Sequence, residues 1–342
     1  MGEAGHTIVA VLVGEGARRS GPDLFQRGFG VAPVSFPSPG LIPDARRRAI
    51  SKLGTFTRNV LRVPWYAGSL RMLREAARRE RPDLVVNFYD LLGGLAFSPR
   101  ARGSARVVAL SSLHYLMDHP QVPLPSGSAA ELGLFRLLTR FTAPAGSSRV
   151  ALSLRPLADA QGPRDSTPSV FPPLLRRAVL DAEPARGDHL LVYLLHHGYA
   201  RDLARWHESH PEQVVHVFWD RPGSPELMEL RPNLICHRPS DTLFLELMRG
   251  CRGVVTTAGF QAVAEALWLG KPVMAVPTHG HIEQRWNAQE AALAGAGITG
   301  TRFDLSAFLE YLPHHAHATA SWRRWVVEGR GRLLRLLEGA AI

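Results

Sequence analysis

The sequence has two cysteines, two lysines and no long apolar run, and these scarcities exclude whole classes of protein. Cys236 and Cys251 lack the spacing of metal ligands, and two isolated thiols are typical of a reducing compartment. No apolar run approaches the length that crosses a bilayer, and the first residues lack the basic segment and cleavage site of a secretory leader. We therefore expect a cytoplasmic protein.

Lysine occurs only at positions 52 and 271, so arginine supplies nearly all of the positive charge behind a net charge of +10. No nucleic-acid-binding motif accompanies this charge, so we expect no nucleic-acid partner. The excess is concentrated in residues 41–81, where eleven basic and three acidic residues are interleaved with apolar ones. This stretch predicts either two solvated helices that flank a sheet, or a surface that contacts an anionic membrane or a phosphorylated acceptor.

Short apolar runs alternate with helical patterns in two series, and 342 residues suffice for two ordinary domains. This alternation predicts an α/β fold with two Rossmann-like, doubly wound domains that bind ligands at the carboxyl ends of their strands. The expected units are a first domain over 1–160, a Pro- and Gly-rich linker over 161–188, a second domain over 189–320 and a terminal helix over 321–342. The expected strands lie at 7–13, 84–87, 106–111 and 148–154, and at 189–195, 214–219, 233–236, 253–257 and 273–276.

The most specific pattern begins at Gly253 and ends at Ala291. A β-branched strand leads into a turn of small residues, and a helix and a second buried strand follow. The turn, residues Thr257, Ala258, Gly259 and Phe260, presents backbone N–H groups at a helix N-terminus, which favours an anion such as a diphosphate. Any doubly wound domain has such turns. The alternative is therefore an ordinary turn without a ligand, in which the glycine serves only the backbone conformation.

Three polar side chains follow this turn. Glu265 lies in the second turn of the helix, where a carboxylate can accept hydrogen bonds from the vicinal hydroxyls of a ribose; otherwise it is an ordinary surface residue of a helix. Glu283 and Gln284 form an acceptor–amide pair suited to sugar hydroxyls. These two could equally cap the helix that follows them.

The segment resembles the donor-binding region of nucleotide-sugar glycosyltransferases of the GT-B fold, in particular the group related to the peptidoglycan N-acetylglucosaminyltransferase that forms lipid II. The resemblance lies in the Ala-Gly-Phe turn at 258–260, the helical Glu265, the Gly-Lys-Pro at 270–272, the Glu-Gln pair and the Asn-Ala at 287–288. It implies two domains that face a cleft, with the C-terminal helix crossing back to the first domain. It also implies an inverting, metal-independent transfer without a cofactor.

The resemblance also implies roles for loops at the ends of other strands. His196, His197 and Gly198 follow the first strand of the second domain, where such enzymes place a loop over the donor phosphates; the alternative is a pair of partly exposed loop histidines. Arg238 follows another strand, in the region that usually holds the nucleobase. We expect no metal site, because no carboxylate or cysteine cluster accompanies the histidines of the donor loop.

The acceptor half departs from the family pattern. Relatives often carry a GEGxGHxxR-like loop whose histidine is the candidate base, but residues 14–20 here read GEGARRS, with Arg19 at the histidine's place. Arginine cannot serve as a base at physiological pH. The remaining candidates for the base are Asp90, His114 and Glu15, each at an expected strand end, and capping of the next helix is an equally good explanation for each. Gly14, Gly16, Arg18 and Arg19 are candidates for binding the acceptor.

These observations predict a glycosyltransferase that moves a sugar from a UDP-GlcNAc-like or dTDP-linked donor to an acceptor hydroxyl, on a small molecule or a lipid-linked glycan. Two alternatives stay open. The altered loop at 14–20 is also expected of a non-catalytic homologue that binds nucleotide sugar or activates a partner transferase. A UDP-GlcNAc 2-epimerase shares the architecture and has a glycine-rich turn before a helical glutamate.

Overall fold

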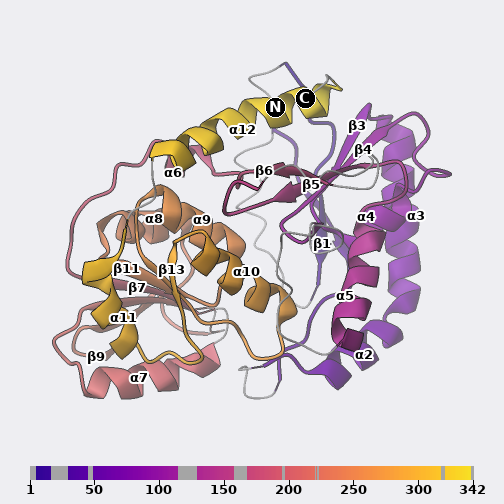
Figure 1. Cartoon of the computed structure of the whole chain (residues 1–342). Coiled ribbons are helices and arrows are strands. Elements are labelled where there is room, and N and C mark those ends of the chain that lie inside the picture. The colour runs from indigo at the N-terminus through magenta and orange to yellow at the C-terminus, as the bar shows by residue number, and fades with distance from the viewer. Residues whose placement is uncertain are drawn as a thin grey trace.

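The computed structural model of the chain has two α/β lobes joined by a long C-terminal helix (Figure 1). The structure describes residues 5–16, 30–44, 49–114, 129–157, 168–194, 197–219, 221, 223–316 and 320–339.

The C-terminal lobe is built on a seven-stranded sheet with the order β13-β12-β11-β7-β8-β10-β9. Its parallel strands are β7 (Leu190–Leu194), β8 (Val215–Trp219), β10 (Leu234–His237), β11 (Gly253–Thr256), β12 (Val273–Ala275) and β13 (Gly297–Thr299). The edge strand β9 (Leu227–Arg231) runs antiparallel to β10. Apolar side chains cover both faces of the central strands, as expected for a parallel sheet between helices.

Alternate residues of β7 enter two different cores. Leu190 and Val192 pack with α7 (Ala200–Glu208) and α11 (Ser306–Tyr311) on one face. Leu191 packs with α8 (Asp241–Gly250) and α9 (Phe260–Trp268) on the other. The short 3-10 turns η3 (His197–Tyr199) and η4 (Leu312–His314) precede α7 and follow α11, and α10 (Ile282–Leu293) lies between β12 and β13 in the chain. The C-terminal ends of β7, β11 and β12 therefore share one edge of the sheet.

The N-terminal lobe contains two parallel ladders within the described residues. The larger has the order β3-β4-β5-β6, from β3 (Leu84–Asn87), β4 (Arg106–Ser111), β5 (Ser148–Leu152) and β6 (Ser169–Phe171). The smaller joins β1 (Leu12–Glu15) to β2 (Val34–Pro37), so the first strand begins later than the apolar run at 7–13 predicts. β6 lies inside the segment that the sequence assigned to the linker, and it hydrogen-bonds to β5.

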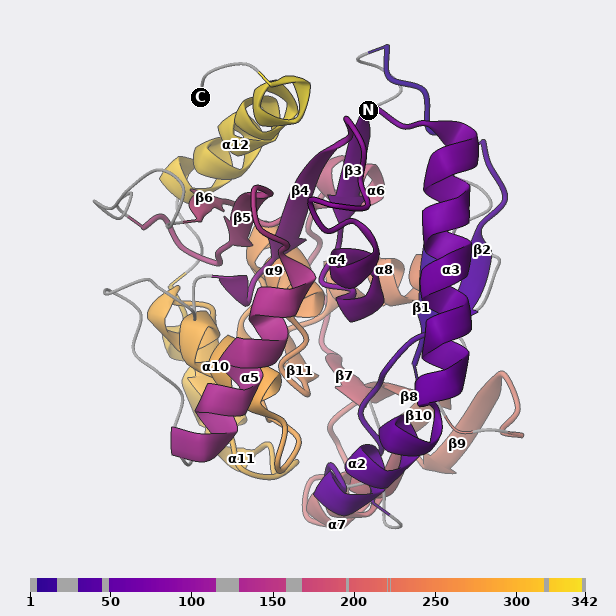
Figure 2. The same ribbon diagram turned by 90° about the vertical axis from the view of Figure 1, so that its right-hand side faces the viewer.

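Helices cover the N-terminal lobe and lead into the next. α2 (Lys52–Leu61) and α3 (Val63–Glu80) follow β2, and Figure 2 shows α3 running along the outer side of this lobe. α4 (Leu91–Ala96) follows β3 and packs closely on α5 (Ala129–Thr142), because Gly94 lies against the carbonyl of Phe141. The one-turn helix α6 (Arg177–Leu180) follows β6.

The last helix, α12 (Ala320–Glu338), connects the two lobes (Figure 1). Trp322, near its start, packs in the core of the C-terminal lobe, and its indole N–H donates to the carbonyl of Leu154 at 2.7 Å. Near its end, Leu333 and Leu336 pack on β4 and β5 of the other lobe. Arg106 of β4 donates to the carbonyl of Leu336 at 2.8 Å. The expected return of the C-terminal helix to the first domain is confirmed.

Candidate functional site

The turn after β11 has the geometry that an anion site needs. Ala258 has the left-handed backbone conformation, with φ of 60°, which costs an L-residue about 1–2 kcal/mol. Asn287 of α10 stabilises the turn by donating to the carbonyl of Ala258 at 3.1 Å. Gly259 is the N-cap of α9 and offers no side-chain cap, and a Cβ built on it would meet no atom within 4 Å. The first turn of α9 is therefore open to a ligand.

Buried polar atoms without a hydrogen-bond partner gather around this turn. In the described part of the chain they include Oγ1 of Thr256 and Thr278, Oδ1 of Asn287 and Nδ1 of His197. Thr256 is the last residue of β11, Thr278 follows β12 and His197 follows β7. Three of these four atoms therefore lie at the ends of neighbouring strands. Buried polar groups are normally satisfied, so this group of atoms is equipped to bind a polar ligand.

Glu265 lies in α9 as the sequence predicted, but its carboxylate already has a partner. The side chain is buried, and Arg176 binds it through two parallel hydrogen bonds, Nε to Oε1 at 2.8 Å and Nη2 to Oε2 at 3.0 Å. The Glu265 hydrogen bonds raise the pKa of Arg176. Gln261 lies one turn earlier in α9 and approaches Oε1 at 3.4 Å. A carboxylate has about four acceptor positions, so the three hydrogen bonds from Arg176 and Gln261 leave about one of them for a ligand.

Arg176 has no motif that would have singled it out in the sequence. It directly precedes α6, in the Pro-rich segment between the lobes, 89 residues from Glu265. Its Nη1 also lies 3.8 Å from Oδ2 of Asp241, the first residue of α8. The guanidinium therefore joins the connecting segment to two helices of the C-terminal lobe.

The Glu283–Gln284 pair divides into two different roles. Gln284 is buried, and its Oε1 accepts a 2.7 Å hydrogen bond from the backbone N–H of Thr278, which orders the loop after β12. Glu283 is half-buried, and burial raises the pKa of its carboxyl. The N-cap of α10 is His281, whose Nδ1 lies 3.4 Å from the N–H of Gln284. Neither member of the pair is the capping residue.

The other predicted donor residues occupy the ends of β7 and β10. His197 and Gly198 lie in η3, directly after β7, and both are half-buried. Arg238 is exposed after β10, and its backbone N–H donates to the carbonyl of Glu226 at 2.9 Å. His196, like Arg18 and Arg19 of the acceptor loop, lies outside the described residues.

In the N-terminal lobe, the predicted base Asp90 lies where three strands end. Its Oδ1 accepts from the N–H of Gly93 at 2.6 Å, so it caps α4, and its Oδ2 accepts from the hydroxyl of Ser38 at 2.8 Å. Gly14 lies so close that a Cβ there would collide with Oδ2 of Asp90. A Cβ on Gly16 would make a tight contact of 3.2 Å with the Cα of Gly40. The fold therefore unites Gly14 with Asp90, and adds Ser38, which the sequence did not indicate.

The other two candidate bases differ from Asp90. Glu15 ends β1 and is half-buried beside β2. His114 is 0% exposed, with Nδ1 3.0 Å from the carbonyl of Val150 and Nε2 3.3 Å from the hydroxyl of Thr142. Burial lowers the pKa of His114 to about 4. In this structure the imidazole links β5 to α5 and has no access to a ligand.

Residues near the predicted donor and acceptor sites contact each other across the two lobes. Trp286 of α10 is buried in one cluster with Leu113 and Ala151 of the N-terminal lobe. Tyr89, next to Asp90, lies near Glu283: burial and, to a lesser degree, the charge of Glu283 raise the pKa of the phenol. At the other end of the donor loop, the N–H of Ile50 donates to the carbonyl of His279 at 3.1 Å.

The comparison with protein families decides which family has this arrangement. A family described as glycosyl transferase family 1 matches residues 19–313. The chain belongs to this family. It is therefore a glycosyltransferase, and the GT-B architecture expected from the sequence is confirmed.

Solved structures with the same fold are distant in sequence. The calicheamicin glycosyltransferase CalG4 is 20% identical, with a TM-score of 0.57 over 99% of this chain and 91% of that one. LpCGTa in complex with UDP is 18% identical, with a TM-score of 0.56 over 97% and 89%. Phytolacca americana UGT2, complexed with UDP-2fluoro-glucose and pterostilbene, is 15% identical, with a TM-score of 0.54 over 88% and 82%. None of the curated proteins matches the chain in sequence.

Two kinds of feature are absent from the described residues. None of their helices has both the length and the apolar character that crossing a membrane requires. Their His, Cys, Asp and Glu side chains form no group of three or more suited to a metal ion.

Proposed function

We propose that this family 1 enzyme transfers a sugar from a nucleoside diphosphate donor, UDP-GlcNAc-like or dTDP-linked, to an acceptor hydroxyl. The observation that carries the proposal is the group of unpartnered buried atoms beside the uncapped start of α9. Backbone N–H groups, threonine hydroxyls and an imidazole are suitable donors for the oxygens of a diphosphate. Two of the solved structures with this fold hold UDP or a UDP-sugar, which supports a donor of this class.

The other donor residues follow from this placement. The turn from Thr257 to Phe260 holds the diphosphate, and His197 donates to it from the end of β7. Glu265 accepts hydrogen bonds from the ribose hydroxyls when Arg176 yields one of its positions. Glu283 and the amide of Gln284 contact the sugar, and the loop around Arg238 holds the nucleobase.

The transfer itself is an inverting single displacement. Asp90 takes the proton of the acceptor hydroxyl through Oδ2, while Oδ1 stays bonded to the start of α4. The acceptor oxygen forms its bond to the anomeric carbon as the bond from that carbon to the diphosphate breaks. The helix dipole of α9 and its N–H groups stabilise the charge that develops on the leaving diphosphate, so no metal or cofactor is invoked.

The acceptor is a small molecule or a lipid-linked glycan in the cytoplasm. Gly14 and Gly16 line its approach, with Arg18 and Arg19 available to bind an anionic group. The motif resemblance to the lipid II-forming group favours N-acetylglucosamine as the transferred sugar and a lipid-linked acceptor.

A ligand panel and one paired substitution test the donor assignment. UDP, dTDP, GDP and their sugars are added to the purified chain, and a bound ligand at about 100 times its Kd stabilises the fold by about 2.7 kcal/mol. Calorimetry with the best ligand then compares Glu265→Ala with Glu246→Ala, which removes an exposed glutamate of α8. We expect weaker binding only for Glu265→Ala. A panel in which no nucleotide raises the melting temperature contradicts the proposal.

A further inference from the structure

Helix α2 exposes its apolar side chains to solvent. None of its ten residues is buried, although the helix carries Leu53, Phe56, Val60 and Leu61. Leu53 and Leu61 are each 73% exposed and Phe56 is 67% exposed. A surface helix of a soluble domain normally turns its apolar stripe toward the core. Here most of the surface of the stripe is exposed instead.

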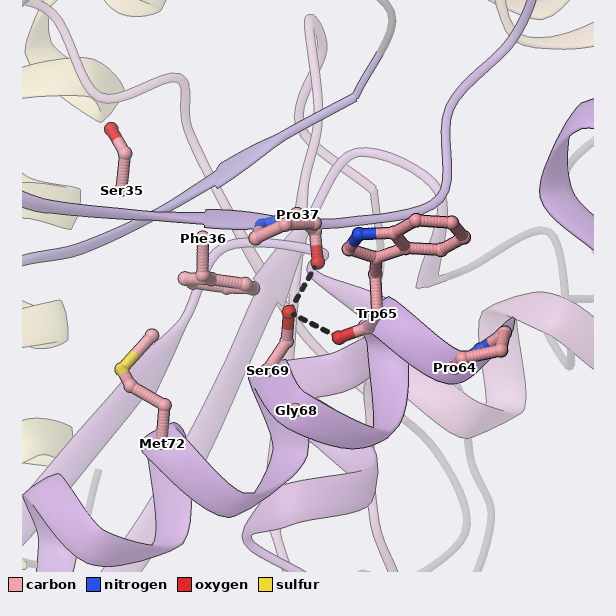
Figure 3. A pocket seen from close by; sticks show the side chains of 8 residues that line it. All are labelled: Ser35, Phe36, Pro37, Pro64, Trp65, Gly68, Ser69 and Met72. Atoms are coloured by element: carbon pink, nitrogen blue, oxygen red, sulfur yellow. Dashed lines mark hydrogen bonds between the residues drawn. The ribbon is translucent and has the colours of Figure 1, made fainter. Parts of the chain in front are cut away.

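The exposed apolar surface continues into the start of α3. Val63 and Trp65 are both largely exposed, and Trp65 is 61% exposed. Trp65 and Pro64 line a pocket between β2 and α3, whose volume is about 490 Å³. Figure 3 shows the side chains that line it. Ser69, at the floor of this pocket, donates its hydroxyl to the carbonyl of Pro37 at 2.7 Å. We call the residues Leu53, Phe56, Val60, Leu61, Val63 and Trp65 the α2–α3 surface.

The charged side chains of α2, and of the residues that lead from it into α3, are all basic. Lys52, Arg58 and Arg62 lie among its apolar residues, and the sequence from 45 to 74 contains no aspartate or glutamate. Among the described residues, Glu131 of α5 brings an acidic group to this region: its Oε1 lies 3.7 Å from the ammonium of Lys52, whose side chain is 73% exposed. An apolar face bordered by cations, with a tryptophan at its edge, is the pattern of helices that lie in the interface of an anionic bilayer.

We propose that the α2–α3 surface docks on a membrane that carries anionic lipids. The apolar side chains enter the interface between head groups and acyl chains, and the basic side chains contact the phosphates. The membrane contact that the sequence predicted for the whole stretch 41–81 is thereby assigned to α2 and the first turn of α3. Ile50, just before α2, hydrogen-bonds to His279 of the donor loop, so docking brings that loop close to the lipid surface.

Sedimentation with lipid vesicles tests the proposal on the full chain. Vesicles of phosphatidylcholine alone are compared with vesicles in which about a third of the lipid is phosphatidylglycerol, at low and at high salt. We expect binding to the anionic vesicles only, weakened by salt because the charges are exposed. Each basic side chain lost should weaken partitioning about fivefold.

Three variants distinguish binding through the α2–α3 surface from nonspecific adsorption to vesicles. Leu53→Glu/Phe56→Glu and Arg58→Glu/Arg62→Glu should each abolish sedimentation, with an unchanged melting temperature because none of these side chains is buried. The control is Val327→Glu, which changes an exposed apolar residue of α12 and should bind as the natural chain does.

Four outcomes overturn the proposal. They are absence of binding to anionic vesicles, equal binding to both vesicle types, undiminished binding of the Leu53→Glu/Phe56→Glu variant, and a dimer in light scattering that this variant dissociates. The last result would show that a second copy of the chain covers the surface.

Discussion

The pairing of Arg176 with Glu265 leads to a quantitative prediction about stability. Arg176→Ala removes both hydrogen bonds to a carboxylate whose side chain is 4% exposed. Leaving a buried acceptor unsatisfied costs about 1–3 kcal/mol. Removing one partner of a fully buried ion pair lowers the free energy of unfolding by about 3–5 kcal/mol. The Arg176 side chain is 35% exposed, however, so water can partly replace it. We therefore expect Arg176→Ala to lower the free energy of unfolding by about 1–3 kcal/mol.

The neighbouring arginine supplies a matched control. Arg177 pairs with Asp181 at 2.9 Å, but these side chains are 66% and 61% exposed. Arg177→Ala should therefore change the free energy of unfolding by less than about 1 kcal/mol. The loss for Arg176→Lys should lie between those of Arg176→Ala and Arg177→Ala. A lysine keeps the charge, but its ammonium cannot make two parallel hydrogen bonds to one carboxylate.

Urea denaturation of the single and double variants measures the pair directly. If the two side chains stabilise each other, Arg176→Ala/Glu265→Ala should lose less stability than the two single losses added together, by about 0.5–3 kcal/mol. Strictly additive losses, or an Arg176→Ala variant as stable as Arg177→Ala, would refute the reasoning.

The same variants report on the nucleotide site. If ribose hydroxyls compete with Arg176 for Glu265, then Arg176→Ala should bind UDP more tightly than the natural chain. Glu265→Ala should bind it about 10–100 times more weakly, because hydrogen bonds to a charged group contribute about 1.5–3 kcal/mol. Weaker UDP binding by Arg176→Ala in calorimetry would show that the guanidinium contacts the nucleotide itself and would contradict the competition.

Further predictions concern the N-terminal lobe. Gly94→Ala places a methyl group against the carbonyl of Phe141 and should destabilise the fold by about 1–3 kcal/mol in urea, whereas Gly133→Ala on α5 meets open space and should stabilise it by about 0.5–1 kcal/mol. The pKa of His114 is lowered to about 4 in the fold, so its contribution to stability is complete above about pH 6.5 and is lost as the pH falls toward 4, by about 3 kcal/mol. Urea midpoints between pH 7.5 and 5 should therefore fall more for the natural chain than for His114→Gln, and parallel curves would contradict this. Asp90→Asn keeps a capping side chain on α4 but removes the proposed base, so release of nucleoside diphosphate should slow about 10²–10⁴-fold with UDP affinity unchanged. Full activity in that variant would exclude Asp90 as the base.

Local patterns in the sequence predicted most elements of the C-terminal lobe. The run at 253–257 predicted β11, and the spacing of apolar residues after it predicted α9 to within one residue. These signals are strong because buried parallel strands and helices impose their own periodicity over a few residues. They were weaker for β9, an exposed edge strand whose alternating pattern is short and rich in charge.

The candidate site shows the limit of such patterns. Sequence spacing placed Glu265 in α9 and Asp90 at the end of β3, but both carboxylates have partners that come from distant segments, Arg176 and Ser38. The turn after β11 was correctly placed, yet its left-handed residue is Ala258 rather than the glycine beside it.

The sequence by itself determined that two series of strands and helices would form facing α/β lobes, and that one strand end would suit an anion. Hydrophobic periodicity and turn chemistry act between near neighbours in the chain, so they can be read directly. Only the tertiary structure decided that His114 is buried, that Arg176 holds Glu265, and that the apolar stripe of α2 faces solvent. These outcomes depend on which segments come into contact although they are tens of residues apart in the sequence. Local spacing of residues carries no information about such contacts.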